Sequence, residues 1–261
     1  MQKSRSRVVS SFTIIKGSLI DQTYAVFQEW DFSLSRGANL RRLREENAMG
    51  TSSTHWARDV SKVLNRRFDP NGRDRPLVGL AKAGCHREVW KPLLLWHMTR
   101  DEFLLRDFLI HWLYPQFIEG AFRIHTGDVI PYLKSLAKKK GVEWSGRWSD
   151  STTSRVASGL LRIATDFSLL TGTQSKEFVS HHLPEESFLY LLHAMADGEP
   201  NARRLIEAVD WRMYLMDASD VERELLRMHQ FRKLHYEVAG SLAQLKLPFG
   251  STADYARGLC A

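Results

Sequence analysis

Apolar residues repeat at alternating steps of four and three between Asp150 and Thr171, and this spacing constrains the fold more than any other feature of the chain. The repeat consists of Val156, Leu160, Ile163, Phe167 and Leu170. At 3.6 residues per turn, such positions share one face of a helix. Asp150, Ser151 or Thr152 could cap its start. The segment therefore predicts an amphipathic helix whose apolar face packs on a core.

Helical patterns cover most of the remaining chain, so we expect an all-α fold. They lie at about 17–30, 35–47, 52–68, 88–99, 101–114, 128–140, 185–197 and 220–235. Residues 101–114 are apolar nearly all round, which is typical of a central buried helix. Alternation at 243–247 predicts a strand of a small β-ribbon near the C-terminus, with 178–180 as its candidate partner.

The helical pattern is interrupted by Pro115 and Gly120, where we place a boundary. The prediction is a compact helical bundle of two subdomains, an N-terminal one over 1–118 and a C-terminal one over 119–249. Residues 250–261 are expected to form a flexible tail.

Composition indicates the class of protein. The 261 residues, 43% of them hydrophobic, suit a folded globular chain. Its uncharged stretches fall short of the ~20 apolar residues that span a bilayer, and the start lacks the features of a secretory signal. The two cysteines, far apart, cannot build a disulfide framework. We expect a cytoplasmic protein without membrane contact.

Charge is distributed unevenly along the chain. The net charge is +7, with 37 Lys and Arg against 30 Asp and Glu, which favours an acidic partner such as nucleic acid. Residues 1–75 and 132–165 are basic. Residues 176–225 carry eleven acidic and five basic residues. We call residues 185–224 the acidic stretch, and a protein partner could dock there.

Three basic clusters are candidates for phosphate contact. The first two contain Arg41 with Arg42 and Arg66 with Arg67, although local ion pairs or a plain surface turn explain them equally well. The third comprises Lys134, Lys138, Lys139, Lys140 and Arg147, followed by the helix start at 151–155 with Thr152, Thr153 and Arg155. It is the strongest, because hydroxyls and amides at a helix start add hydrogen bonds to the cations. Trp144 and Trp148 flank Arg147, so this loop is either an aromatic and cationic surface or a simple anchor.

Enzyme signatures are missing from the sequence. The glycines at 79 and 84 have the spacing of a phosphate loop, but Cys85 and His86 replace the required Lys and Ser or Thr. The histidines at 97, 181, 182 and 193 lack a matching carboxylate or cysteine cluster. We therefore expect no catalytic residues, metal or cofactor, and we keep an unrecognised nuclease as a weak alternative.

The order of several segments resembles one known family. These segments are Ser11-Phe12-Thr13 with Leu19, Trp90 to Trp96 leading into 103–108, and Trp148 to Arg155 leading into 160–163 and 166–170. They resemble the BrxA family of BREX bacteriophage-exclusion systems over about residues 11–249. The family offers no catalytic residues to transfer, and its threonine and arginine helix start corresponds to Thr152, Thr153 and Arg155.

The resemblance implies a small helical protein with a NusB-like fold. Such a protein acts beside a methyltransferase, a phosphatase-like protein and ATPases, and is thought to bind double-stranded DNA without chemistry of its own. We therefore expect a non-enzymatic, DNA-binding accessory component of phage defence with little sequence specificity. The alternatives are a protein adaptor within the defence complex, which would use the acidic stretch, and an RNA-binding NusB-like protein.

Overall fold

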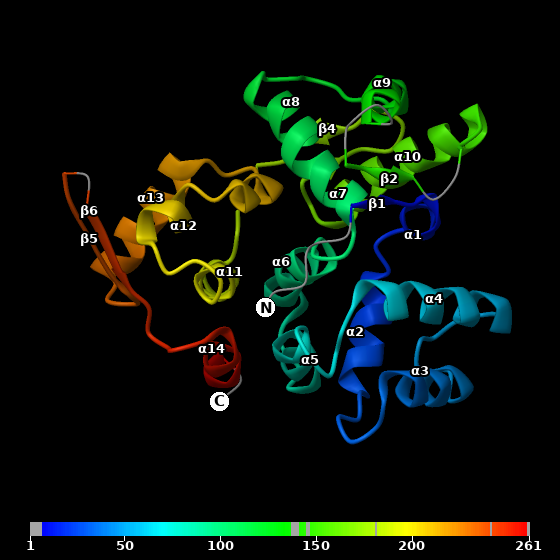
Figure 1. Ribbon diagram of the computed structural model, residues 1–261, viewed down its shortest axis with the longest axis horizontal. Helices are drawn as coiled ribbons and strands as arrows, with labels where there is room; N and C mark the ends of the chain where they lie inside the picture. Colours follow the sequence, from blue (N-terminus) through cyan, green and yellow to red (C-terminus); the bar gives the residue numbers. More distant parts are fainter. Residues whose placement is uncertain (1–6, 137–140, 145–146, 181, 241, 260–261) are drawn as a thin grey trace.

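The computed structural model describes residues 7–136, 141–144, 147–180, 182–240 and 242–259, and this part of the chain is mainly helical, as the sequence predicts (Figure 1). The helices of its first half are α1 (Ser11–Lys16), α2 (Ile20–Gln28), α3 (Arg36–Glu45), α4 (Thr54–Arg67), α5 (Arg75–Lys82), α6 (Arg87–Met98), α7 (Phe103–Phe108), η1 (Leu109–Leu113) and α8 (Tyr114–Ile118). Those of its second half are α9 (Thr126–Leu136), α10 (Asp150–Asp166), α11 (Glu185–Ala196), α12 (Ala202–Ile206), η2 (Val209–Tyr214), α13 (Ala218–Gln230) and α14 (Thr252–Leu259).

The predicted central helix is present as the continuous run α7, η1 and α8. Its apolar side chains, including Leu105, Phe108 and Ile110, are buried. The middle section, η1, is π-helical, with the N–H of Tyr114 bonded to the carbonyl of Leu109. Proline has no N–H and clashes with the preceding turn, so Pro115 accounts for this local widening.

Helix α10 confirms the amphipathic helix that the apolar repeat after Asp150 predicts. Its residues Val156, Leu160 and Ile163 are fully buried. The cap is Ser149, one residue before the predicted candidates, and its Oγ accepts a hydrogen bond from the N–H of Thr152. The helix ends at Asp166, so the apolar pattern continues past it into a short strand.

Three short two-stranded pairs accompany the helices. Strand β1 (Val8–Val9) is parallel to β2 (Glu143–Trp144), whereas β3 (Leu170–Thr171) is antiparallel to β4 (Glu177–Phe178). The predicted C-terminal ribbon exists, but its partner was predicted wrongly. Strand β6 (Leu242–Lys246) pairs with β5 (His235–Ala239), because a local hairpin closes a much shorter loop than a pairing with residues 178–180 would.

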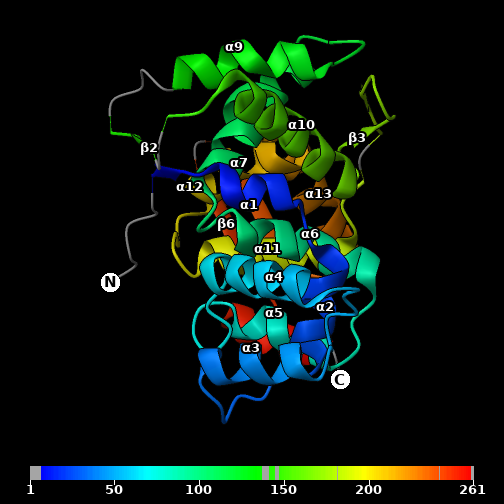
Figure 2. The same ribbon diagram turned by 90° about the vertical axis from the view of Figure 1, so that its right-hand side faces the viewer.

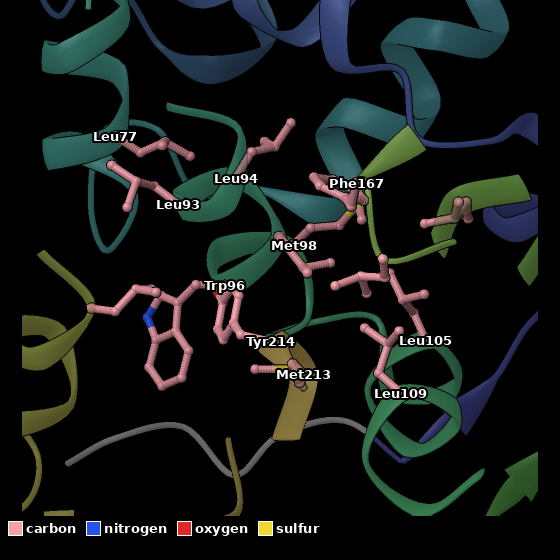
Figure 3. Packing of buried hydrophobic residues seen from close by; sticks show 14 of the residues in the cluster. Leu77, Leu93, Leu94, Trp96, Met98, Leu105, Leu109, Phe167, Met213 and Tyr214 are labelled. Carbon is pink, nitrogen blue, oxygen red and sulfur yellow. The ribbon is translucent and has the colours of Figure 1, made fainter. Parts of the chain in front are cut away.

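One hydrophobic core extends across the predicted boundary at residue 118. Leucines from α5, α6, α7 and η1 meet Met213 and Tyr214 of η2 (Figure 3). The hydroxyl of Tyr214 donates to the carbonyl of Pro92 in α6 at 3.0 Å. The packing therefore connects residues before and after position 118.

The expected flexible tail was a wrong prediction for most of its length. Residues 252–259 form α14, which packs on α5 and α11. Tyr255 and Ala256 are buried there, and the hydroxyl of Thr252 donates to Asp197 at 2.6 Å. In the described part of the chain, every helix is too short or too polar to cross a membrane.

Candidate nucleic-acid interface

Helix α10 presents a polar stripe to solvent, opposite its apolar one. The stripe consists of the exposed residues Ser151, Ser154, Arg155, Ser158 and Arg162. They recur at helical spacing, so one side of α10 carries two guanidinium groups among three hydroxyls. Arginine neutralises phosphates, and both residue types donate hydrogen bonds to phosphate oxygens.

The hydroxyls at the start of α10 surround its N-cap. Ser149 Oγ lies 3.0 Å from Ser151 Oγ and 3.1 Å from Thr152 Oγ1. Thr153 is buried, and its hydroxyl donates to the Ser149 carbonyl at 3.0 Å. Thr152 is half-buried and remains at the surface. The prediction that Thr153 contacts DNA is wrong, because its side chain is buried and its hydroxyl forms a hydrogen bond within the fold.

Helix α1 packs against α10 at very close range. A Cβ atom on Gly159 would lie 2.9 Å from the carbonyl oxygen of Ile14, so a larger residue would force the helices apart. Arg162 of α10 reaches across and donates to the carbonyl of Ile15 at 3.2 Å. A hollow of about 520 Å³ opens beside this contact, lined by Ile15, Thr126, Ser154, Arg155, Ser158, Gly159 and Arg162. The polar stripe of α10 therefore borders a hollow that reaches α1.

Helix α4 lies on the other side of α1 and carries a row of cations. Arg58, Lys62 and Arg66 are exposed and four residues apart, so they follow one side of the helix. Arg66 donates to the Oγ of Ser10, the residue before α1, at 3.0 Å. Figure 2 shows α10, α1 and α4 following one another down the same side of the molecule. The fold thus brings one member of each of two predicted basic clusters, Arg66 and Arg155, to one side.

An ion pair lies at the α1 to α4 contact. Asp59 Oδ2 is 2.5 Å from the ammonium of Lys16, and this hydrogen bond lowers the pKa of the carboxyl. The two charges offset each other. Five exposed cations of α4 and α10 have no carboxylate of the described residues within 4.0 Å, and we call them the basic face: Arg58, Lys62, Arg66, Arg155 and Arg162.

Arg67 does not belong to this surface, and its predicted role was wrong. Its side chain is fully buried and pairs with Glu102 at 3.2 Å. It also donates to the carbonyls of Thr13, Gly17 and Ser18 at 2.9–3.0 Å. These carbonyls lie at the C-terminal end of α1, so Arg67 caps that helix and cannot reach a phosphate.

The first predicted cluster lies on α3, below α4 in Figure 2. Arg41 is exposed. Arg42 is partly used within the fold, because it pairs with Glu46 at 2.9 Å and donates to the carbonyl of Glu29 at 2.6 Å. Arg41 is thus the freer of the two for an external partner.

Part of the third cluster, Lys138, Lys139 and Lys140, lies outside the described residues. The exposed Arg147 follows this segment. Trp144 and Trp148 form an edge-to-face pair with ring centroids 4.6 Å apart. They line a hollow of about 530 Å³ together with Leu133, Lys134, Arg147, Asp150 and Thr153. The pairing of β2 with β1 holds Trp144 in place, so this loop is both an anchor and a surface.

Histidine side chains are candidate metal ligands in the sequence, and the structure shows what surrounds two of them. Nδ1 of His97 lies 2.7 Å from Asp74, and Nε2 lies 2.8 Å from the hydroxyl of Tyr190. All three side chains are buried in the core, which gives no substrate access. His193 is buried against Tyr255, with ring centroids 5.0 Å apart. Within the described residues, no group of three His, Cys, Asp or Glu is arranged to hold a metal ion.

Sequence reasoning missed part of the basic face. Arg58, Lys62 and Arg162 were not singled out, although the four-residue spacing of 58, 62 and 66 was visible on the predicted helix at 52–68. The sequence of the same helix also indicates that Arg67 does not lie on the exposed side. That residue falls at helical spacing from Val60 and Val63, on the apolar side.

Comparison with known proteins gave one match. A family model described as BrxA matches residues 11–194, which is 184 of the 261 residues. The matched range includes α1, α4 and α10, the helices around which the basic face is built. The curated proteins and the solved structures gave no match.

Proposed function

Since the chain belongs to the BrxA family of BREX phage-defence systems, we propose that it acts there as a non-enzymatic protein that binds the backbone of double-stranded DNA with little sequence specificity. The observation that carries this proposal is the basic face. Its five cations lie on two helices on either side of α1, and they have no internal carboxylate partner in the described residues.

Electrostatics explains why this surface suits a polyanion. A cation that is already paired gains little from a phosphate, because it must first give up its partner. An unpaired surface cation releases counterions from the DNA when it neutralises a phosphate, and this release drives binding. The hydroxyls of Ser151, Ser154 and Ser158 add hydrogen-bond donors that hold the register on the backbone without reading bases.

The predicted cluster at the start of α10 extends the proposed surface. Arg155 belongs to both sets, Thr152 lies one turn before it, and Arg147 lies in the loop that precedes the helix. We include Lys138, Lys139 and Lys140 in the proposal on their sequence, as part of the same loop. Arg41 and Arg42 would contact DNA only if the duplex extended past α4.

The decisive experiment compares two triple variants for binding to a fluorescent DNA duplex at several salt concentrations. Lys62→Ala/Arg66→Ala/Arg155→Ala removes three cations of the basic face. Arg203→Ala/Arg204→Ala/Arg223→Ala removes three exposed arginines that pair with carboxylates elsewhere. We expect the first variant to lower the slope of log affinity against log salt by about 2–3, because each lost phosphate contact contributes ~0.9. The second variant should keep the wild-type slope.

Equal losses in the two variants, or no binding by the wild type at low salt, would refute the proposal. Competition with duplex RNA of the same length tests the RNA-binding alternative, which predicts preference for RNA. Cleavage of the DNA in the presence of Mg²⁺ would contradict a non-enzymatic role and identify the protein as a nuclease.

The adaptor alternative places a protein partner on the acidic stretch. Exposed apolar side chains near that region, Val209, Leu226 and Phe231, favour it. A complex with the methyltransferase or the phosphatase-like protein that survives nuclease treatment would support an adaptor. In that case, the basic-face variant should leave the complex intact.

A further inference from the structure

A cavity separate from the basic face lies between α5 and α14, which pack on each other. Its volume is about 790 Å³, within the ~300–1,000 Å³ typical of small-molecule sites. The cavity is lined by glycines and alanines, three arginines, one phenylalanine and one proline: Phe32, Gly72, Arg73, Arg75, Pro76, Gly79, Ala83, Ala253, Ala256 and Arg257. None of the basic-face residues belongs to this set.

The walls of the cavity are mostly apolar and come largely from two facing helices. Small residues of two facing helices, such as Gly79 and Ala256, leave the space open between them. A Cβ built on Gly79 would meet no atom within 4 Å, so this space is unfilled. Phe32 closes one side, and the guanidinium of Arg75 lies over its ring, 4.2 Å from the centroid. A planar ligand suits a space between two helices, because its faces can contact both of them.

The charged residues that line the cavity are all arginines. No Asp or Glu is among its lining residues. Arg73 pairs with Asp74 and Asp101, and Arg257 pairs with Asp254. No carboxylate among the described residues pairs with Arg75, although it lies at the mouth of an apolar cavity. An anionic ligand group would give that guanidinium its missing partner.

From these observations we infer that the cavity between α5 and α14 binds a small planar aromatic anion about the size of a nucleoside monophosphate. The ring system lies between the small residues of the two helices, and the anionic group pairs with Arg75. A nucleotide and an aromatic carboxylate share this chemistry, and the experiment below separates them.

The test is titration calorimetry of the full chain with three probes: AMP, 1-naphthoate and the uncharged adenosine. We expect saturable one-to-one binding of at least one anion, with adenosine weaker than AMP if the nucleotide is the ligand. Gly79→Leu should abolish binding, because its side chain fills the cavity. Gly37→Leu is the matched control, since Gly37 also lies in a helix with no atom near its Cβ position, but outside the cavity.

Arg75→Gln provides a second variant at an exposed position, where folding is least affected. It should weaken the binding of the anion about tenfold, the usual loss for one charge-assisted hydrogen bond. It should leave DNA binding unchanged, so the two proposals fail independently. AMP binding identifies a nucleotide site, and binding of 1-naphthoate alone identifies an aromatic carboxylate site. Binding of neither anion, or equal affinity in the Gly79→Leu and Gly37→Leu variants, overturns the inference.

Discussion

The basic face and the acidic stretch carry opposite charges, and the fold uses those charges differently. The five cations of the basic face have no carboxylate partner in the described residues. Most carboxylates of the acidic stretch form ion pairs with other residues of the protein. Glu185 contacts both Arg227 and Lys233, at 3.3 and 3.4 Å, and Glu207 contacts Arg203 at 2.7 Å.

Further pairs follow along the acidic stretch: Glu199 with Arg204, Asp210 with Arg106, Asp220 with Arg223 and Glu224 with Arg227. Several of the arginines, such as Arg106 and Arg227, come from outside the stretch. A count of charges along the sequence therefore overstates the acidity that a partner would meet. The difference teaches that pairing, more than local net charge, separates a surface available to a partner from one used by the fold.

The largest effect should come from a cation that the fold uses. Arg67→Met leaves Glu102 buried without its charge partner and the end of α1 uncapped. We expect the free energy of unfolding to fall by ~3–5 kcal/mol, as for other broken buried pairs. Urea unfolding measures this loss. Its neighbour provides the control, because Arg66→Met should change the free energy of unfolding by less than ~0.5 kcal/mol and weaken DNA binding. A similar stability loss in both variants would contradict the contrast between them.

Removing a buried carboxylate should lower the free energy of unfolding more than removing a carboxylate of the acidic stretch. Burial raises the pKa of Asp74, but hydrogen bonds and charge from His97 and Arg73 outweigh it and lower the pKa to about 2. Its unfolded value is 3.8, so the ionised form stabilises the fold above about pH 4 and this contribution disappears as the pH falls towards 2. Asp74→Asn should cost ~2 kcal/mol at pH 7. Urea unfolding at pH 7 and pH 2.5 checks this, and a loss independent of pH would speak against the assignment.

A substitution at the contact of α1 with α10 should change both the stability of the protein and its affinity for DNA. Gly159→Ala puts a methyl group against the Ile14 carbonyl and should cost ~1–2 kcal/mol. Because α10 carries Arg155 and Arg162, DNA affinity should fall as well. Gly127→Ala is the control, since its Cβ would meet no atom within 4 Å. Thermal unfolding and DNA titration measure the two effects, and unchanged DNA affinity would place binding elsewhere.

The smallest effect should come from the acidic stretch. Glu185→Gln removes a partly exposed pair with Arg227 and should change the free energy of unfolding by ~0–1 kcal/mol. DNA affinity should stay at the wild-type value, because the carboxylate is already offset. A clear gain in affinity would show that the acidic stretch repels DNA across the molecule. It would contradict the view that ion pairs already offset the charge of this stretch.

Long helices were predictable from the sequence because their apolar repeats are local. The patterns at 35–47, 52–68 and 88–99 correspond closely to α3, α4 and α6. Short helices were missed, among them α1 and α12, because five or six residues give fewer than two turns of pattern. Helix α14 was missed for another reason, since its burial depends on α5 and α11, which are distant in sequence.

The candidate interface was predictable only in part. Helix spacing places Arg66 and Arg67 on different sides of α4, but it does not show that Glu102 and the end of α1 lie beside the second. The spatial relation of α4 to α10 depends on α1 between them, and a sequence pattern contains no such information. Arg155 was identified because it follows a helix start with a recognisable cap.

The insertion of α1 between α4 and α10 also determines when this surface is completed during synthesis. Lys16 and Asp166, the last residues of α1 and α10, are 150 residues apart. At ~5–20 residues per second, a ribosome needs roughly 8–30 s to cover that distance. Arg67 and Glu102 are made within this interval and Gly159 near its end, so α1 gains its capping partner before its packing partner. The contact between Ile14 and α10 is therefore among the later ones that synthesis makes possible.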